Sequence, residues 1–266
     1  MNLNLKIIFI ILSYLFCTNF VSANEETKEK IRNDINKKFS DTSIVIGEIN
    51  KVEPLGLYEV EINNNFLYVS EDLKWLVKGD IFNFKTDKNF TQAREYERSI
   101  SQIKSFKNFI TYQSDNEKRV AYVFTDPTCP YCHRLHENID ILNEYGLTVK
   151  YIPFPRNGLS GKGYEQSAEI WCQEDKKKAY NKISNNQTDK EYKKPTNECY
   201  NIVKNGFELG NNVKVRGTPK TYISNGVISN GFSNVADLLI KADLLDPSNP
   251  EELKEIQNKI QFKGLN

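Results

Sequence analysis

The pattern of hydrophobic and polar residues first separates a β-rich region near the start of the chain. Short runs with alternating hydrophobic and polar positions, separated by turn residues, fill residues 43–84, and this is typical of strands joined in a meander. Residues 26–39 ahead of them predict a charged helix. A piece of about 60 residues has little room for a core, and its strands need their edges covered. We expect a second copy of the chain to cover them; packing against the rest of its own chain is the alternative.

A helical pattern follows the β-rich region. Hydrophobic residues recur every three or four positions over residues 91–110, which predicts an amphipathic helix with Thr91 as its N-cap. They are Ala93, Tyr96, Ile100, Ile103 and Phe106. A helix of this length between two domains would act as a rigid spacer of about 30 Å.

The rest of the chain alternates between strand and helix patterns. In order, we expect a buried strand at 120–124, a helix at 129–145, a strand at 147–154, mostly helix over 163–205 interrupted near Pro195, a hairpin of 221–224 with 227–229, and a helix at 235–242. This order suits an α/β sandwich with a mixed sheet. Residues 247–266 form a polar tail in which Ser248-Asn249-Pro250 predicts a helix start.

The first 23 residues have the pattern of a secretory signal. One Lys (Lys6) precedes an apolar run from Ile7 to Phe16, and Val21-Ser22-Ala23 supplies the small residues of a cleavage site. The apolar run is short for a transmembrane helix. We therefore expect residues 1–23 to be removed on export.

Charge and composition exclude some classes of function. Lys plus Arg number 36 and Asp plus Glu number 35, a net charge of +1, so no basic field favours nucleic acid. The 14 Tyr and 15 Phe supply enough large side chains for real cores rather than a disordered chain. Export would remove Cys17 and leave Cys129, Cys132, Cys172 and Cys199, an even number in an oxidising compartment where disulfides persist.

The candidate chemistry lies at Cys129-Pro130-Tyr131-Cys132, at the start of the helix predicted after the buried strand. The free N–H groups and partial positive charge of a helix N-terminus favour a thiolate, so Cys129 is the expected nucleophile with a lowered pKa. Cys132, one turn further in, is expected to be the less exposed, resolving thiol.

Three other interpretations of this motif compete. The pair could be a purely structural disulfide. Cys129, Cys132, His133 and His136 could bind zinc, although one short helix cannot easily surround a tetrahedral ion. Cys129 to His133 also spells the C-x-x-C-H pattern of haem c attachment. The motif occurs once, directly after a buried strand, and Met1 is the chain's single Met, which disfavours haem with a Met axial ligand. We expect no cofactor and no metal.

A second motif strengthens the redox interpretation. Arg216-Gly217-Thr218-Pro219 precedes the predicted hairpin, and a Pro opening an edge strand is where a cis peptide can be held. In the thioredoxin architecture such a loop lies beside the C-x-x-C helix. A plain turn at Pro219 is the alternative.

Together these motifs resemble the DsbC/DsbG family of periplasmic protein-disulfide isomerases. The similar segments cover nearly all of the chain after the signal. They are Gly56-Leu57-Tyr58-Glu59-Val60, Leu67-Tyr68-Val69-Ser70-Glu71-Asp72, Phe124-Thr125-Asp126, Cys132-His133-Arg134-Leu135-His136, Phe154-Pro155-Arg156, Ile170-Trp171-Cys172 and Val215-Arg216-Gly217-Thr218-Pro219.

The resemblance implies an α+β organisation: a small β-rich, cystatin-like dimerisation domain (24–88), a linker helix (89–112), a thioredoxin-fold catalytic domain with a helical insertion (113–246) and a tail (247–266). It implies a V-shaped homodimer kept reduced by the membrane reductase DsbD. Its clients would be misfolded exported proteins with wrong disulfides, bound near Thr218, Pro219, Pro130 and Tyr131. Cys172 and Cys199 resemble the family's second, structural disulfide.

Two departures leave the exact activity open. The dipeptide Pro130-Tyr131 resembles DsbG rather than the Gly-Tyr of DsbC, and the dipeptide shifts redox poise. The extra cysteine pair resembles DsbC. A holdase chaperone with a secondary C-x-x-C, or a DsbG-like thiol-protecting reductase, is therefore an alternative to an isomerase. A dedicated oxidase is disfavoured, because DsbA-type oxidases lack a dimerising domain.

Overall fold

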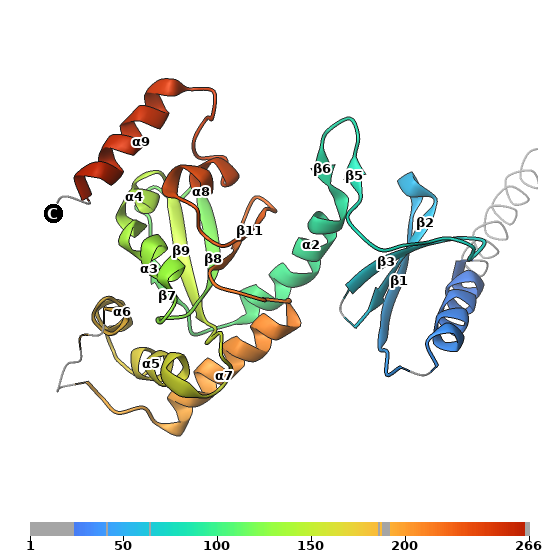
Figure 1. The fold of residues 1–266 in the computed structure, drawn as a ribbon, viewed down its shortest axis with the longest axis horizontal. Coiled ribbons are helices and arrows are strands. Elements are labelled where there is room, and N and C mark those ends of the chain that lie inside the picture. The colour runs from blue at the N-terminus through green and yellow to red at the C-terminus, as the bar shows by residue number, and fades with distance from the viewer. Residues whose placement is uncertain (1–23, 41, 64, 186, 188–191, 264–266) are drawn as a thin grey trace, which may run out of the picture. The chain divides into compact units, whose positions relative to one another are not determined.

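The computed structural model describes residues 24–40, 42–63, 65–185, 187 and 192–263 (Figure 1). The expected signal segment, residues 1–23, lies outside the described residues. Internal contacts divide the chain after Ile81, and we describe the two units separately. In the described part of the chain, no helix is both long and apolar enough to cross a membrane.

The N-terminal unit packs one helix against an antiparallel sheet. The strands β1 (Ile46–Val52), β2 (Leu57–Ile62), β3 (Asn65–Ser70) and β4 (Leu76–Val77) lie in chain order, with the 3₁₀ turn η1 (Glu53–Leu55) between the first two. Figure 1 shows the helix over residues 24–38 beside this sheet. Ile31 and Ile35 of the helix meet alternate residues of β2, including Tyr58 and Val60, in one buried cluster. The meander is therefore present, and its first strand begins at Ile46 rather than 43.

The last strand expected in the meander belongs elsewhere. Residues 81–84 were expected to complete it, but β5 (Phe82–Asn83) pairs with β6 (Lys88–Asn89) as a separate hairpin of the second unit. The Asn83 side chain closes the turn by accepting hydrogen bonds from the backbone N–H groups of Lys85 and Thr86, each at 3.0 Å.

The predicted spacer helix is α2 (Phe90–Ser105). Asn89, not Thr91, caps it, because the Asn89 side chain accepts from the Gln92 amide at 2.8 Å. The helix stops before 110 because Phe106 is extended, and β7 (Ile110–Tyr112) follows as a strand that the sequence pattern hid. Its Ile103 is fully buried against the second unit, so α2 is packed along its C-terminal half rather than standing free.

The second unit is built on a five-stranded mixed sheet. Its strands are β7, β8 (Arg119–Thr125), β9 (Leu147–Pro153), β10 (Lys220–Ile223) and β11 (Ile228–Asn230), in the order β11-β10-β8-β9-β7. β8 and β9 are parallel and every other pair is antiparallel. The predicted order of elements and mixed sheet are confirmed, with β7 added at one edge.

Helices cover both faces of this sheet. Besides α2, they are α3 (Pro130–Glu137), α4 (Ile139–Glu144), α5 (Gly161–Trp171), α6 (Lys176–Ser184), α7 (Asn197–Asn212), α8 (Val235–Lys241) and α9 (Pro250–Lys263). The single helix expected over 129–145 is wrong. Asn138 breaks it, since its side chain donates to the Arg134 carbonyl at 2.7 Å in place of regular helix geometry.

The alternation of β8 separates two cores. Ala121 and Val123 face the cluster formed with α3, α4, α6 and α8, whereas Tyr122 and Phe124 face the cluster formed with α2 and the end of α7. Thr125, the last residue of β8, continues the first of these faces. The C-terminal end of β8 therefore delivers its side chain beneath the start of α3.

Candidate active site

Cys129 and Cys132 lie at the junction between β8 and α3. Cys129 is the N-cap of α3, Pro130 occupies its first turn, and both thiols are free. Pro suits this position because its missing N–H would have had no helical partner. Cys132 was expected to be the less exposed thiol, but the two side chains are equally covered, at 0% and 1% exposure. Exposure therefore does not distinguish the two cysteines.

The Thr218–Pro219 loop lies directly over Cys129. The Thr218–Pro219 peptide bond is cis, and the Cys129 Sγ donates to the Thr218 carbonyl oxygen at 3.2 Å. Strand pairing explains how residues so distant in sequence meet, because Lys220 of β10 is opposite Phe124 of β8. The Thr218 hydroxyl is buried without a hydrogen-bond partner among the described residues, and the Thr218 side chain favours the thiolate of Cys129, which lowers the pKa of that thiol.

The environment assigns different pKa values to the two thiols. A hydrogen bond from the Cys132 thiol, helped by Thr218 and by the positive charge of Arg156, lowers the pKa of Cys129 to about 5 against the opposing effect of burial. Burial, and then the neighbouring Cys129 thiolate, raise the pKa of Cys132 well above its ordinary value. The arrangement can therefore hold one nucleophilic thiolate and one protonated thiol at neutral pH.

A buried carboxylate fixes the loop that leads to Cys129. Asp126 accepts hydrogen bonds from the Thr128 amide (2.7 Å) and hydroxyl (2.6 Å), and from the Arg156 amide (2.9 Å) and Nε (3.2 Å). Arg156 Nη2 also donates to the Thr128 carbonyl at 3.3 Å. The guanidinium is thus bonded to Thr128, the residue that immediately precedes Cys129.

Pro130 and Tyr131, both exposed, form the outer surface of the motif. The Tyr131 ring is 51% exposed, and the Arg134 guanidinium carbon lies 4.4 Å from its centroid. This cation–π contact holds an aromatic ring beside the nucleophile.

The two histidines point to separate partners. His133 Nε2 donates to the Pro127 carbonyl at 2.5 Å. His136 Nε2 donates to Asn181 Oδ1 at 2.5 Å, and its Nδ1 lies 3.3 Å from the Tyr151 hydroxyl. Within the described residues, no three His, Cys, Asp or Glu side chains gather as a metal site would require. The geometry thus does not support the zinc interpretation.

The two other cysteines of the described residues are joined to each other. Cys172, at the end of α5, is bonded to Cys199, in the first turn of α7. This bond ties the helical insertion together.

Sequence reasoning missed Asp126 and Arg156 as site residues, and it missed the buried contact between Thr125 and Tyr180. Phe124-Thr125-Asp126 and Phe154-Pro155-Arg156 entered only as segments of the resemblance, and Tyr180 not at all. Thr125 and Tyr180 meet across 55 positions of sequence, and no periodicity links residues so far apart. Residues 126 and 156 follow β8 and β9, which are parallel and therefore end at the same edge of the sheet. A strand–helix–strand order that suggests such a parallel pair could have indicated that these residues meet.

Comparisons with known proteins agree with this geometry. Residues 21–92 match the family model described as a disulfide bond isomerase protein N-terminal domain, and residues 106–242 match a thioredoxin-like domain. The chain is 34% identical over 237 residues to the thiol:disulfide interchange protein DsbC of Haemophilus influenzae, covering 88% of this chain and 96% of that protein.

A second DsbC protein and one solved structure are also similar to this chain. The DsbC of Escherichia coli K12 is 30% identical over 199 residues, which cover 74% of this chain and 81% of that protein. The crystal structure of a disulfide interchange protein from Neisseria gonorrhoeae aligns with 52% of this chain and 96% of its own, at 25% identity and a TM-score of 0.44.

Proposed function

The chain belongs to the DsbC family of thiol:disulfide interchange proteins, and we propose that it isomerises and reduces misplaced disulfides of exported proteins in the periplasm. One observation carries the proposal. The Cys129 sulfur has a lowered pKa and lies under the Thr218 carbonyl, while Cys132 behind it has a raised pKa. Such a pair is suited to start an exchange with one sulfur and finish it with the other.

The exchange begins at Cys129. Its thiolate attacks one sulfur of a client disulfide, forming a mixed disulfide and releasing the other client sulfur as a thiolate. If a different client thiolate then attacks the bonded client sulfur, a rearranged client disulfide forms and Cys129 leaves as a thiolate. If Cys132 attacks the Cys129 sulfur instead, a Cys129–Cys132 disulfide forms and the client leaves reduced.

Client binding would use the surface around the motif. Thr218 and Pro219 present backbone beside the nucleophile, where an extended client segment can add as a strand. Pro130 and the half-exposed Tyr131 ring provide an apolar contact on the other side of Cys129. Both contacts recognise backbone and apolar surface, which suits a protein with many misfolded clients.

The N-terminal unit supports a homodimer formed through residues 24–88. Trp75, Leu76 and Val77 at the edge of its sheet are 72%, 43% and 43% exposed, and an uncovered apolar edge strand invites pairing with another chain. We further propose that the signal over residues 1–23 directs the chain to the periplasm and that the membrane reductase DsbD returns Cys129 and Cys132 to thiols.

Refolding of a client with scrambled disulfides tests the function. The reduced protein should restore the client's activity, Cys129→Ser should abolish this effect, and Cys132→Ser should retain isomerisation while accumulating mixed disulfides. Equal rates for the wild type and Cys129→Ser would refute the proposal.

A holdase chaperone is the second candidate, favoured by exposed apolar side chains such as Val45, at 72% exposure, and Phe84, which is fully exposed. Suppression of client aggregation by Cys129→Ser separates the two, since a chaperone keeps that activity and a thiol enzyme loses turnover. A DsbG-like thiol-protecting reductase, suggested by Pro130-Tyr131, would instead reduce single oxidised thiols faster than it rearranges scrambled disulfides.

A further inference from the structure

The resolving thiol must lose its proton in a place that solvent does not reach. Cys132 is 1% exposed, and its sulfur can attack a mixed disulfide at Cys129 only as a thiolate. Titratable groups whose charges act on it are Cys129 on the same helix, Arg156 after β9, Tyr151 on β9 and Tyr180 on α6. Asp126 contacts it through a backbone hydrogen bond. Burial and Cys129 both disfavour the thiolate.

Two buried hydroxyl groups, those of Thr125 and Tyr180, lie near this thiol. Thr125, at the end of β8, lies beneath the first turn of α3 that carries Cys132, and its hydroxyl favours the Cys132 thiolate by hydrogen bonding. The Thr125 Oγ1 lies 2.6 Å from the hydroxyl of Tyr180 on α6, and both side chains are completely buried. A Thr hydroxyl has one proton, so it can donate to Cys132 only while it accepts from Tyr180.

We propose that the Thr125–Tyr180 hydroxyl pair stabilises the Cys132 thiolate as it forms, and thereby sets the rate at which Cys132 resolves a mixed disulfide. The inference rests on the proposed function, since it concerns the second step of that exchange. Thr125 touches the reacting sulfur and is the catalytic residue of the pair. Tyr180 acts through Thr125 and is a positioning residue.

The direction of the two hydrogen bonds follows the state of the sulfur. While Cys129 is bonded to a client sulfur and no longer accepts from Cys132, the Cys132 thiol donates to Thr125 and Thr125 donates to Tyr180. As the proton leaves, both bonds reverse, so that Tyr180 donates to Thr125 and Thr125 donates to the thiolate. The thiolate attacks Cys129, a Cys129–Cys132 disulfide forms, and the departing client thiolate takes up one proton, which balances the proton lost by Cys132.

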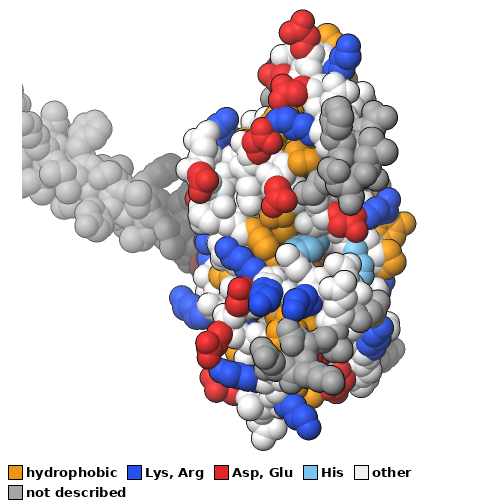
Figure 2. Space-filling model, turned by 90° about the vertical axis from the view of Figure 1, so that its left-hand side faces the viewer, with side chains coloured by type: hydrophobic (Ala, Val, Ile, Leu, Met, Phe, Trp, Pro, Cys, Tyr) orange, Lys and Arg blue, Asp and Glu red, His pale blue; other side chains and the backbone are white. Residues whose placement is uncertain are grey.

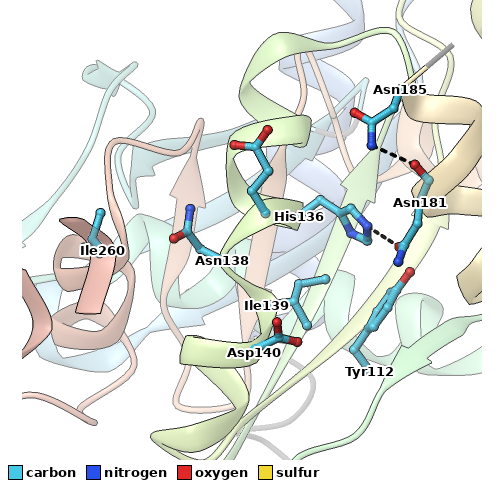
Figure 3. A pocket seen from close by; sticks show the side chains of 9 residues that line it. Tyr112, His136, Asn138, Ile139, Asp140, Asn181, Asn185 and Ile260 are labelled. Atoms are coloured by element: carbon cyan, nitrogen blue, oxygen red, sulfur yellow. Dashed lines mark hydrogen bonds between the residues drawn. The ribbon is translucent and has the colours of Figure 1, made fainter. Parts of the chain in front are cut away.

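The surroundings of Tyr180 keep its hydroxyl in place. Its ring packs against the rings of His136, with centroids 4.6 Å apart, and Tyr151, at 4.9 Å. Figure 3 shows His136 at the wall of a pocket of about 610 Å³, pointing toward Asn181 of the same helix as Tyr180. The face that carries α3, α6 and α9 is hollowed here, with histidine and hydrophobic side chains visible (Figure 2). The imidazole–amide bond thus fixes α6, and with it Tyr180, against α3.

The resolution step can be measured directly. Cys129 is loaded with glutathione as a mixed disulfide, and the release of glutathione by Cys132 is followed as a function of pH. Tyr180→Phe keeps the ring and removes the hydroxyl, and should slow release about tenfold near pH 7, as expected for a lost hydrogen bond to a charged group. Its rate profile should move to higher pH. Thr125→Val should do the same, and Thr125→Ser should restore the rate.

The control is Tyr222→Phe, which removes a buried tyrosine hydroxyl that donates to the Val213 carbonyl on the other face of the sheet. It should leave the release rate within about twofold of the wild type. The inference is overturned if Tyr180→Phe releases glutathione as fast as the wild type, or if Tyr222→Phe is slowed equally. Failure of wild-type Cys129 to form any mixed disulfide would instead overturn the proposed function, and this inference with it.

Discussion

The guanidinium of Arg156 is held by the buried carboxylate of Asp126, with Nε 3.2 Å from Oδ2 and the Arg156 amide 2.9 Å from the same oxygen. Asp126 begins the loop whose backbone closes at Cys129, since the Cys129 amide donates to the Asp126 carbonyl at 3.0 Å. Asp126 therefore fixes the nucleophile through its backbone carbonyl and a nearby positive charge through its carboxylate.

Arg156→Gln should raise the pKa of Cys129, because its positive charge favours the thiolate. Cys132→Ala should raise this pKa further, since the hydrogen bond from the Cys132 thiol contributes more than the charge of Arg156. The rate of iodoacetamide trapping of reduced protein over a pH series gives both values. Arg134→Gln is the matched control, because Arg134 stacks on the exposed Tyr131 ring. A Cys129 pKa unchanged by Arg156→Gln would contradict the assignment.

The stability of the reduced protein should depend on pH in a defined direction. The pKa of Cys129 is about 5 when folded, against about 8.5 in an unfolded chain. Between these values the unfolded state binds more protons, so the free energy of unfolding rises with pH, and this contribution is lost as pH falls through about 5. The raised pKa of Cys132 has the opposite effect, so stability should fall again at more alkaline pH.

Urea unfolding of the reduced protein and of Cys129→Ala at several pH values measures this dependence. The difference in free energy between the two proteins should grow from about pH 5 to about pH 8. A difference that stays constant over this range would mean that Cys129 has an ordinary pKa in the folded chain.

The sequence predicted the strands that carry the site better than the ends of its helices. The alternating run at 57–62, the buried-type run at 120–124 and the run at 147–154 were each predicted as strands, and β2, β8 and β9 lie there. β7 was missed because Ile110 continues the helical spacing of Ile103 and Phe106. The break at Asn138 was missed because Leu135, Ile139 and Leu142 keep that spacing across it.

The site shows the same division between local and distant signals. Cys129 and Cys132 can be recognised from the sequence because they are three positions apart, on one turn of a helix. The Thr125–Tyr180 pair depends on how α6 packs over β8, which only the three-dimensional arrangement determines. The covering of Cys129 by the Thr218 loop is likewise a tertiary feature, since the two residues are 89 positions apart.

The full chain should sediment as a dimer that the edge of the N-terminal sheet holds together. Leu76→Glu places a charge on the exposed edge strand β4 and should produce monomers at micromolar concentration, because a buried unpaired charge destabilises an interface. Leu159→Glu in the second unit is a matched control, since Leu159 is 37% exposed and Leu76 is 43% exposed. Analytical ultracentrifugation compares them. A wild-type monomer, or a Leu76→Glu dimer as stable as the wild type, would refute this interface.

The Cys172–Cys199 disulfide should stabilise the fold without taking part in exchange. The bonded residues are 27 positions apart, and closing a loop of that length contributes about 3–4 kcal/mol in the chain-entropy account. Replacing both residues by Ala should therefore lower the free energy of unfolding by about that amount. Cys199 is buried in the first turn of α7, so brief thiol treatment should open an oxidised Cys129–Cys132 pair first. Peptide mapping after such treatment identifies the bonds that remain.

The double Ala variant should still alkylate at Cys129 at the wild-type rate, since that environment is built by Asp126, Arg156 and Thr218. A bridge between Cys132 and Cys172 in the native protein, or a Cys129 rate that falls with the double substitution, would show that the two pairs communicate.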